Sequence, residues 1–244
     1  MNKTILVIGA SGGIGSQVAK DLINEGYSVI GTYSNTPINN PDVKSINLDF
    51  LSKDSIQNFV DKIKSMDTNL YAIINCAGIV EYENKNIEED LKIWDKTIAV
   101  NLTSNYVLAK YFEDRIEEHG RFIMISSTDA MFGGSITVSY AVSKAGVNSL
   151  VKSFSLLFKD KKVSVNAIAP GWVNTKMNED IGDDFVQKVK NLIPQNRIAE
   201  PKDISNIVTF LLKPEAGYIN GQVITVDGGY TNQDPTLLIE EEIV

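Results

Sequence analysis

Short apolar runs rich in β-branched residues alternate with longer helical patterns along this chain of 244 residues. The runs expected to form strands are Thr4–Ile8, Ser28–Thr32, Ser45–Leu48, Ala72–Asn75, Arg121–Ser126, Val163–Ala169 and Val223–Val226. The segments expected to form helices are Ile14–Glu25, Lys53–Lys64, Ile87–Val100, a stretch within Leu102–Glu117, Tyr140–Phe158 and Pro201–Leu212. Strands that alternate with helices build βαβ units, in which the strands run parallel. The pattern therefore predicts an α/β fold: a doubly wound, seven-stranded parallel sheet with helices on both faces, in one domain over residues 1–230.

Composition limits the partners and the location. The formal net charge is −8 and no basic run occurs, which argues against nucleic acid and anionic membranes as partners, because phosphate contacts need clustered cations. Cys76 is the only cysteine and His119 the only histidine, so no intrachain disulfide can form and no metal site is expected. The chain shows no signal peptide and no apolar stretch long enough to span a bilayer, which predicts a cytoplasmic location.

Two segments depart from the alternation. Residues 174–198 separate a predicted strand from a predicted helix. Their apolar stripe at helical spacing consists of Phe185, Val189, Leu192 and Ile193. A long insertion after the carboxyl end of a strand is typical of an active-site lid, which is our interpretation, and a surface helix packed on the core is the alternative. Residues 231–244 form a C-terminal tail that is expected to fray or to dock on a neighbouring subunit.

The first predicted strand ends in a glycine-rich turn, Gly9-Ala10-Ser11-Gly12-Gly13-Ile14-Gly15, and a helix follows. Glycines let the backbone approach a pyrophosphate closely, and the helix N-terminus adds free N–H groups and the positive end of a dipole. The spacing differs from the more common Gly-x-Gly-x-x-Gly pattern, and a tight turn without a ligand is the alternative. We interpret the turn as a dinucleotide phosphate site. Its binding residues are expected to be Gly9, Ser11, Gly13, Ile14 and Gly15.

Tyr140 and Lys144 lie four residues apart at the start of a long predicted helix, so their side chains share one face. A phenol with its ordinary pKa near 10 is a poor base at neutral pH, and a neighbouring ammonium is expected to lower that pKa. Ser127 follows a strand, where its hydroxyl is expected to bind a substrate oxygen. The three residues predict proton exchange with an alcohol or carbonyl oxygen while a hydride moves.

Together these motifs resemble the short-chain dehydrogenase/reductase family, in its single-domain, Rossmann-type branch. Further matches occur in order along almost the whole chain. They are Asn75-Cys76-Ala77-Gly78, Trp94-Asp95, Val100-Asn101-Leu102, Ile125-Ser126-Ser127, Pro170-Gly171 with Thr175, and Ile224-Thr225-Val226-Asp227-Gly228-Gly229. Ile8 stands where the family usually has threonine. Cys76 also departs from the pattern and is interpreted as a buried small side chain.

The resemblance assigns a role to each candidate residue. It implies that Tyr140 is the general acid and base, and that Lys144 lowers the pKa of Tyr140 and binds the nicotinamide ribose. It also implies that Ser127 orients the substrate oxygen and that Asn101 holds a water linking Lys144 to solvent. The uninterrupted Tyr-x-x-x-Lys spacing fits alcohol–ketone chemistry better than the family's enoyl reductases. Further implied cofactor contacts are Leu48, Asp49, Asn75, Ala77, Gly78, Pro170, Gly171, Val173 and Thr175.

The choice between NAD and NADP depends on the end of the second strand. An acidic residue there would bind the ribose 2′-hydroxyl of NAD, and Tyr33 occupies the expected position. No carboxylate repels a 2′-phosphate, and Ser34 and Asn35 can hydrogen-bond one. No arginine attracts it, and Gly12 fills a position that is often basic in NADP-preferring relatives. NADP(H) is therefore favoured, and NAD(H) stays open.

The substrate is less constrained. The chain length and the run Gly217-Tyr218-Ile219-Asn220-Gly221-Gln222 resemble the 3-oxoacyl-carrier-protein reductases. Those relatives tend to be basic where this chain has Glu117-Glu118, which would repel an acidic carrier protein, although Lys161 and Lys162 offer partial compensation. A small ketone, a sugar or a polyketide-like compound is the alternative. The pocket is expected to include Asp129, Met131, Trp172 and Met177.

The helix predicted over Tyr140–Phe158 is apolar almost all round, which is typical of a helix buried on two sides. A second copy would cover one side, so we expect a homotetramer or a dimer; tetramers are common in the family. A non-catalytic NAD(P)-binding redox sensor is a second functional hypothesis. Retention of the residues with implied catalytic roles argues against a sensor.

Overall fold

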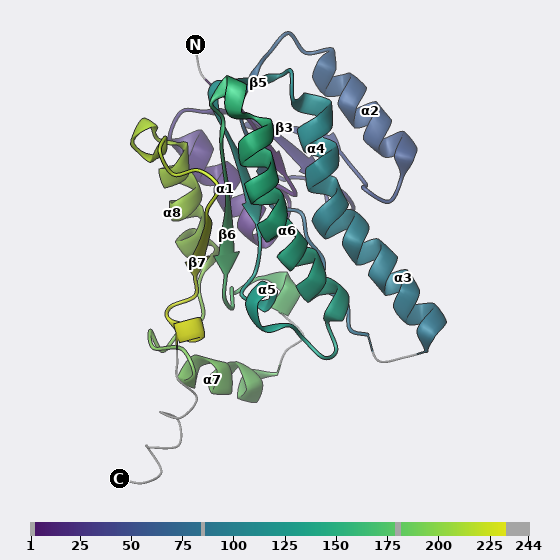
Figure 1. The fold of residues 1–244 in the computed structure, drawn as a ribbon, viewed down its shortest axis with the longest axis vertical. Coiled ribbons are helices and arrows are strands. Elements are labelled where there is room, and N and C mark those ends of the chain that lie inside the picture. Colours follow the sequence, from purple (N-terminus) through teal and green to yellow (C-terminus); the bar gives the residue numbers. More distant parts are fainter. Residues whose placement is uncertain (1–2, 84–85, 179–181, 233–244) are drawn as a thin grey trace.

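The computed structural model describes residues 3–83, 86–178 and 182–232, and within them seven strands form one parallel sheet (Figure 1). The strands are β1 (Thr4–Ile8), β2 (Ser28–Tyr33), β3 (Val43–Asn47), β4 (Leu70–Asn75), β5 (Ile116–Ile125), β6 (Ser164–Pro170) and β7 (Val223–Val226). Their order across the sheet is β3-β2-β1-β4-β5-β6-β7. The order reverses between β1 and β4, and ligands of such sheets bind at the carboxyl ends of the strands at this point. The predicted fold class is confirmed.

Helices cover both faces of the sheet. They are α1 (Gly13–Asn24), α2 (Lys53–Lys64), α3 (Ile87–Ile98), α4 (Ser104–Phe112), α5 (Asp129–Phe132), α6 (Val138–Leu157), α7 (Asp183–Asn191) and α8 (Pro201–Leu212). One face buries an apolar cluster that includes Phe59, Phe112 and Phe154, from α2, α4 and α6. The other face buries Leu22 and Val208, from α1 and α8. Two apolar layers therefore enclose the sheet, as the continuously apolar strands predict.

The helical region after β4 differs from the sequence prediction. The helix expected to end at Val100 continues through a π-helical segment, Ala99–Thr103, into α4. A π-helical turn contains an extra residue and commonly occurs at functional sites. Asn101 lies inside this turn and is buried. α4, Ser104–Phe112, lies within the expected stretch Leu102–Glu117.

β5 starts earlier than expected, and its pairing with β4 is irregular between Leu70 and Ala72. No helix within the described residues is long and apolar enough to cross a bilayer. Of the predicted tail, residues 233–244 lie outside the described residues.

Candidate active site

Close backbone contacts shape the glycine turn between β1 and α1. Gly9 has a φ of +73°, and a Cβ on it would lie 2.9 Å from the backbone nitrogen of Ala77. A Cβ on Gly13 would lie 2.5 Å from Cγ2 of Thr175, and one on Gly15 would lie 2.2 Å from the carbonyl oxygen of Gly9. The turn therefore packs directly against the end of β4 and against the loop after β6. It lies between β1 and β4, where the strand order reverses.

The N-terminus of α1 suits a phosphate. No side chain caps it, and N–H groups at such a helix end bind phosphate oxygens together with the helix dipole. Thr32 supports the turn: its hydroxyl accepts the N–H of Gly9 at 3.0 Å, and its carbonyl accepts the N–H of Ala10 at 2.8 Å. These residues fit the pyrophosphate of a dinucleotide. Sequence analysis missed Thr32, because its partner lies 23 residues away.

The candidates for the adenosine end follow β2 and β3. The side-chain amide of Asn47 donates to the carbonyls of Tyr33 and Ser34, at 3.3 and 2.8 Å, and so holds the loop that carries them. Ser34 and Asn35 are exposed, so their polar groups are accessible to a ribose phosphate. One carboxylate oxygen of Asp49 accepts a backbone N–H two residues ahead at 2.9 Å. Asp49 therefore caps the turn before α2. Its contact with the cofactor stays a prediction.

The predicted catalytic tyrosine, serine and lysine meet at the carboxyl edge of the sheet. The hydroxyl of Ser127 acts on that of Tyr140 and lowers its pKa, which brings the two side chains together at the site. Nζ of Lys144 lies 5.6 Å from the centroid of the Tyr140 ring and donates to the carbonyl of Ile125 at 2.9 Å. An ammonium has three donors, so two remain that fit the hydroxyls of a ribose.

Asn101 joins this group through Gly78. A Cβ on Gly78 would lie 3.4 Å from Nζ of Lys144 and 3.7 Å from Oδ1 of Asn101. The amide of Asn101 accepts the N–H of Ile79 and donates to its carbonyl, each at 2.9 Å, and donates to Oγ of Ser143 at 3.1 Å. Asn101 therefore ties the loop after β4 to α6. Its role in holding a water stays a prediction.

Asn75, expected to contact the cofactor, uses its side chain within the protein. Its amide donates to Oγ of Ser104 at 3.0 Å and to Oδ1 of Asn105 at 2.8 Å, and accepts the N–H of Ala77 at 3.1 Å. These bonds fasten the end of β4 to α4. The contribution of Asn75 is the shape of the loop after β4.

Burial decides the protonation of the catalytic pair. It raises the pKa of Tyr140 to about 12, more than the hydrogen bond with Ser127 lowers it, and Asp129 raises that pKa further. Burial also lowers the pKa of Lys144 from 10.5 to about 8. The net pKa of Tyr140 is therefore set by burial, and the lowering expected from Lys144 stays a prediction. The pKa of the Cys76 thiol is raised to about 12 by burial, in agreement with a neutral, inert side chain.

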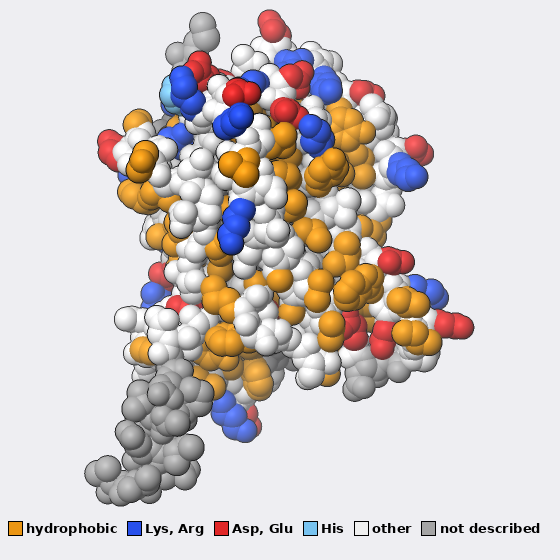
Figure 2. Space-filling view, in the orientation of Figure 1, with side chains coloured by type: hydrophobic (Ala, Val, Ile, Leu, Met, Phe, Trp, Pro, Cys, Tyr) orange, Lys and Arg blue, Asp and Glu red, His pale blue; other side chains and the backbone are white. Residues whose placement is uncertain are grey.

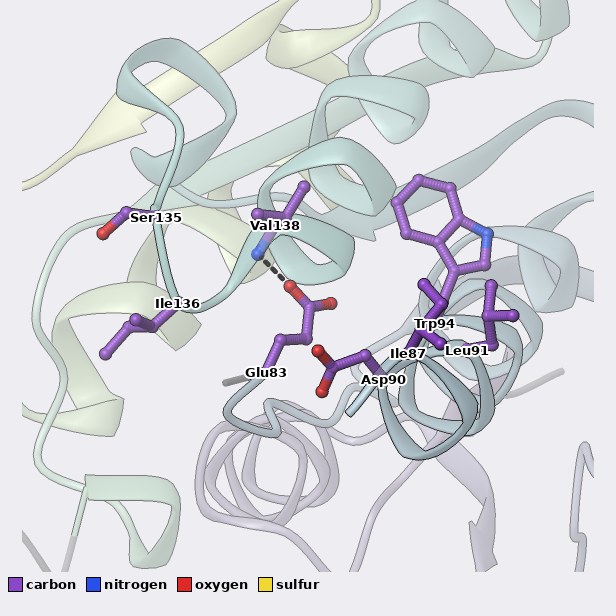
Figure 3. A pocket seen from close by; sticks show the side chains of 8 residues that line it. All are labelled: Glu83, Ile87, Asp90, Leu91, Trp94, Ser135, Ile136 and Val138. Carbon is purple, nitrogen blue, oxygen red and sulfur yellow. Dashed lines mark hydrogen bonds between the residues drawn. The ribbon is translucent and has the colours of Figure 1, made fainter. Parts of the chain in front are cut away.

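Glu83, in the loop after β4, positions the helix that carries Tyr140. Its carboxylate accepts the N–H of Val138 at 2.7 Å (Figure 3) and that of Ser139 at 2.9 Å. A carboxylate at a helix N-terminus stabilises that end. No sequence signal marks Glu83, because its partners lie 55 and 56 residues away.

Beside Glu83 lies a surface groove of about 310 Å³ between the start of α3 and the loop before α6. Its lining residues are Glu83, Ile87, Asp90, Leu91, Trp94, Ser135, Ile136 and Val138. None of the four predicted substrate-pocket residues belongs to it. The groove therefore lies outside the catalytic group described above.

The predicted lid leaves and rejoins the core at one place. Val173 and Ala199 form an isolated parallel bridge, and the N–H of Ala199 donates to the carbonyl of Trp172 at 2.8 Å. The ring of Trp172 packs edge-to-face on Phe185 of α7, with 5.6 Å between ring centroids. Of the predicted apolar stripe, Phe185 is 48% exposed, whereas Val189 is buried. α7 thus packs only partly on the core.

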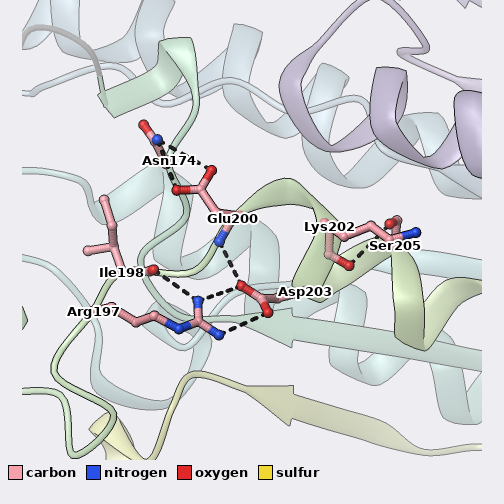
Figure 4. A network of polar contacts seen from close by, with 7 residues as sticks. All are labelled: Asn174, Arg197, Ile198, Glu200, Lys202, Asp203 and Ser205. Carbon is pink, nitrogen blue, oxygen red and sulfur yellow. Dashed lines mark hydrogen bonds and ion pairs between the residues drawn. The ribbon is translucent and has the colours of Figure 1, made fainter.

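Polar contacts tie both ends of the lid to the N-terminus of α8 (Figure 4). The amide of Asn174 donates to the carboxylate of Glu200 at 3.2 Å, and Arg197 makes two hydrogen bonds with Asp203, at 2.6 and 3.0 Å. We call these two contacts the lid clamp. Since Asn174, Arg197 and Glu200 are exposed and Asp203 is partly so, water competes with the clamp.

Among the predicted substrate-pocket residues, Asp129 lies beside the catalytic group. Its N–H donates to Oγ of Ser127 at 3.1 Å, and its carboxylate acts electrostatically on Tyr140. Met131 and Met177 are exposed, at 49% and 44%. Their contact with a substrate stays a prediction, as does that of Trp172.

The charged residues invoked for a carrier protein lie at the wrong end of the sheet. Glu117 and Glu118 are at the start of β5, whereas Ser127 follows its carboxyl end. Nζ of Lys161 donates to three backbone carbonyls at 2.8 to 2.9 Å, and Lys162 pairs with Glu118 at 2.7 Å. These charges therefore lie away from the catalytic group, and their effect on a carrier protein stays a prediction.

Comparisons with known proteins find relatives over almost the whole chain. Residues 9–231 match the family model described as enoyl-(acyl carrier protein) reductase. The chain is 30% identical to a 2-dehydro-3-deoxy-D-gluconate 5-dehydrogenase of Pseudoalteromonas atlantica, covering 93% of this chain and 95% of the relative. It is 33% identical to the 3-oxoacyl-[acyl-carrier-protein] reductase FabG of Buchnera aphidicola subsp. Schizaphis graminum, covering 93% and 96%.

Solved structures show the same fold. An aldohexose dehydrogenase of Thermoplasma acidophilum superposes with a TM-score of 0.87 at 26% identity, over 96% of each chain. A short chain dehydrogenase family protein of Francisella tularensis gives a TM-score of 0.86 at 26% identity, over 96% of this chain and all of that one. With its motifs in order and its glycine turn at the point where the strand order reverses, the chain belongs to the short-chain dehydrogenase/reductase family of NAD(P)-dependent oxidoreductases.

Proposed function

We propose that this oxidoreductase interconverts a ketone and a secondary alcohol, with Tyr140 as the group that exchanges the proton. The observation that carries the proposal is the meeting of Tyr140 with Ser127, which lowers the pKa of Tyr140, and with the buried ammonium of Lys144, whose Nζ lies 5.6 Å from the centroid of the Tyr140 ring. Because burial raises the pKa of Tyr140 to about 12, its phenol is protonated at neutral pH. A protonated phenol supports the direction of carbonyl reduction, in which Tyr140 donates.

The bound nicotinamide supplies a hydride to the carbonyl carbon. Ser127 holds the carbonyl oxygen by a hydrogen bond, and Tyr140 gives its proton to that oxygen as the C=O double bond becomes single. The carbon gains two electrons and the product is an alcohol. Lys144, as an ammonium, stabilises the tyrosinate that remains. Tyr140 and Lys144 are separated by only three residues, and this short spacing supports reduction of a ketone rather than of an enoyl group.

Replacing the phenol tests this assignment. We expect Tyr140→Phe to lower kcat at least about 100-fold, the lower range for general acid catalysis, with the Kd of the nicotinamide cofactor nearly unchanged. Tyr218→Phe is the matched control, because Tyr218 is fully exposed. Cofactor binding without turnover in the wild-type protein on any carbonyl compound would instead support the redox-sensor hypothesis.

The relatives name two kinds of substrate, a sugar acid and 3-oxoacyl thioesters, at 30% and 33% identity. We propose a small ketone as the substrate and keep the carrier-bound thioester as the second candidate. Oxidation of the reduced nicotinamide is measured with acetoacetyl thioesters, diketones, keto sugars and cyclic ketones. Turnover of the thioester alone would overturn the small-ketone proposal.

We propose NADP(H) as the preferred cofactor, with NAD(H) as the alternative. Exposed Ser34 and Asn35 support this choice, because their polar groups can hydrogen-bond a 2′-phosphate. A lower KM for NADPH than for NADH is expected. Equal or reversed KM values would contradict the preference.

We propose that residues 174–198 act as the lid and that the protein forms a homotetramer or a dimer. Figure 2 shows hydrophobic side chains gathered over α6 and its neighbours. Exposed members of α3, α4 and α6 include Leu91, Trp94, Tyr106, Val142 and Leu156. The inner side of α6 is buried in the core, so a second copy is expected to cover the outer side. A monomer by light scattering at micromolar concentration would contradict self-association.

A further inference from the structure

Asp129 presents a carboxylate that the protein leaves without a partner. Among the described residues, no hydrogen bond or ion pair reaches either carboxylate oxygen; only the backbone of Asp129 is used, its N–H in the bond to Ser127 and its carbonyl in a bond from Gly133. The side chain is half-buried, and burial raises the pKa of the carboxyl group. Removing a carboxylate from water without a donor destabilises a folded protein. The position therefore needs an explanation beyond folding.

The carboxylate also works against the proposed chemistry. Its charge raises the pKa of Tyr140, so it opposes formation of the tyrosinate. A role in stabilising α5 explains little, since this helix has only four residues. Unfavourable arrangements of this kind are typical of sites that a ligand completes. A donor group on the substrate would relieve both effects, because it would satisfy the oxygens and spread their charge.

We propose that Asp129 accepts a hydrogen bond from a hydroxyl group on the carbon next to the reacting carbonyl, so that the substrates are α-hydroxy ketones and the corresponding diols. This inference rests on the proposed function. Ser127 holds the reacting oxygen, and the N–H of Asp129 donates to that serine, so the two side chains can contact neighbouring substrate oxygens. An ammonium group is a less suitable donor, because Lys144 already places a buried cation at the site. A hydroxyl also loses less hydration on burial than an ammonium.

The test compares substrates that differ by one hydroxyl. We measure kcat/KM with NADPH for 3-hydroxy-2-butanone against 2-butanone, and for 2-hydroxycyclohexanone against cyclohexanone. The wild-type protein is expected to prefer the hydroxylated member at least about tenfold, the value of a hydrogen bond to a charged group. In Asp129→Leu the ratio should fall to about one. Asp54→Leu is the matched control, because Asp54 is an exposed first-turn carboxylate on α2 and should keep the wild-type ratio.

Two further readouts separate binding from a structural role. Asp129→Asn keeps the shape and one acceptor oxygen, so its ratio of kcat/KM values should lie between those of the wild type and Asp129→Leu. This variant still tests the inference if Asp129→Leu folds poorly. Thermal unfolding without substrate should show Asp129→Asn at least as stable as the wild type, because an unpartnered carboxylate is removed. A purely structural residue would show lower stability with an unchanged ratio.

The outcomes are distinct. Turnover of both ketones in each pair with equal kcat/KM, or an Asp129→Leu ratio like that of the wild type, overturns the inference and leaves the proposed function intact. A preference for 3-amino-2-butanone over its hydroxyl analogue also overturns the inference. Absence of turnover on every ketone, with cofactor still bound, overturns the proposed function as well.

Discussion

The cofactor half and the lid half of the active site are held together by different kinds of contact. In the cofactor half, the glycine turn touches the carbonyl of Gly9, the backbone of Ala77 and the side chain of Thr175 with no space for a further carbon. In the lid half, exposed polar side chains form the clamp of Asn174 and Arg197 with α8. Backbone contacts cannot yield without moving the chain, whereas solvated ion pairs are easily replaced by water. Substitutions should therefore have large effects on cofactor binding in the first half and small effects on substrate binding in the second.

The largest effect is expected at Gly15. A Cβ there would lie 2.2 Å from the carbonyl oxygen of Gly9, so Gly15→Ala must displace the start of α1. Misplacement by about 1 Å can reduce function on the order of 100-fold, and we expect the Kd of the cofactor to rise at least that much. Gly12→Ala is the control in the same turn, since its Cβ meets nothing closer than 3.4 Å. Equal Kd values for the two variants would break the comparison.

Lys144 should give the next effect, as a dependence of stability on pH. Burial lowers its pKa from 10.5 to about 8, so between these values the unfolded chain binds a proton that the folded protein does not. The free energy of unfolding therefore rises with pH in this window. Relative to Lys144→Met, the wild type should gain about 2 kcal/mol between about pH 7.5 and about pH 10 in urea unfolding.

The measurement stops near pH 10 because Tyr140 acts in the opposite direction above it. Its pKa rises from 10.0 unfolded to about 12 folded, so its contribution is lost as pH increases further. Lys152→Met, on the exposed side of the same helix, is the control. If the stability of the wild type relative to Lys144→Met fell over the same pH range, the predicted rise of the unfolding free energy with pH would be wrong.

Replacing Glu83 tests whether the loss of one carboxylate near the surface lowers stability and kcat. Glu83→Ala removes the acceptor of the N–H groups of Val138 and Ser139, and we expect a loss of about 1–2 kcal/mol in unfolding free energy. kcat should fall while the Kd of the cofactor stays nearly constant, because the start of α6 carries Tyr140. Glu83→Gln, with one acceptor oxygen, should lie between wild type and Glu83→Ala. Glu89→Ala, at the exposed first turn of α3, is the control.

The smallest effect is expected from the lid clamp. Arg197→Met removes both bonds to Asp203, yet Arg197 is exposed and Asp203 is partly exposed. We expect the KM of the substrate to change by no more than about fivefold, with kcat and the Kd of the cofactor nearly constant. A larger loss than that of Glu83→Ala would show that the lid half is as tightly determined as the cofactor half.

The sequence by itself determined the layers of the fold and the identities of the central groups. Alternating strand and helix patterns are local, and they were sufficient for the seven-stranded parallel sheet. The glycines before a helix predicted the phosphate site, and the four-residue spacing of Tyr140 and Lys144 predicted that their side chains share one face of a helix. The meeting of Tyr140 and Ser127 also follows, since each stands beside a predicted element.

Only the tertiary structure decided what surrounds these groups. Thr32 supports Gly9 from 23 residues away, and Glu83 supports the start of α6 from 55 residues away, so no local pattern reveals either contact. Burial, which depends on the whole packed molecule, raises the pKa of Tyr140, and spacing along the chain does not reveal this. The direction of β5 likewise separated Glu118 from the active site. The physical reason is common to these cases: spacing along the chain determines which groups share an element, whereas desolvation and long-range partners arise only when the elements pack.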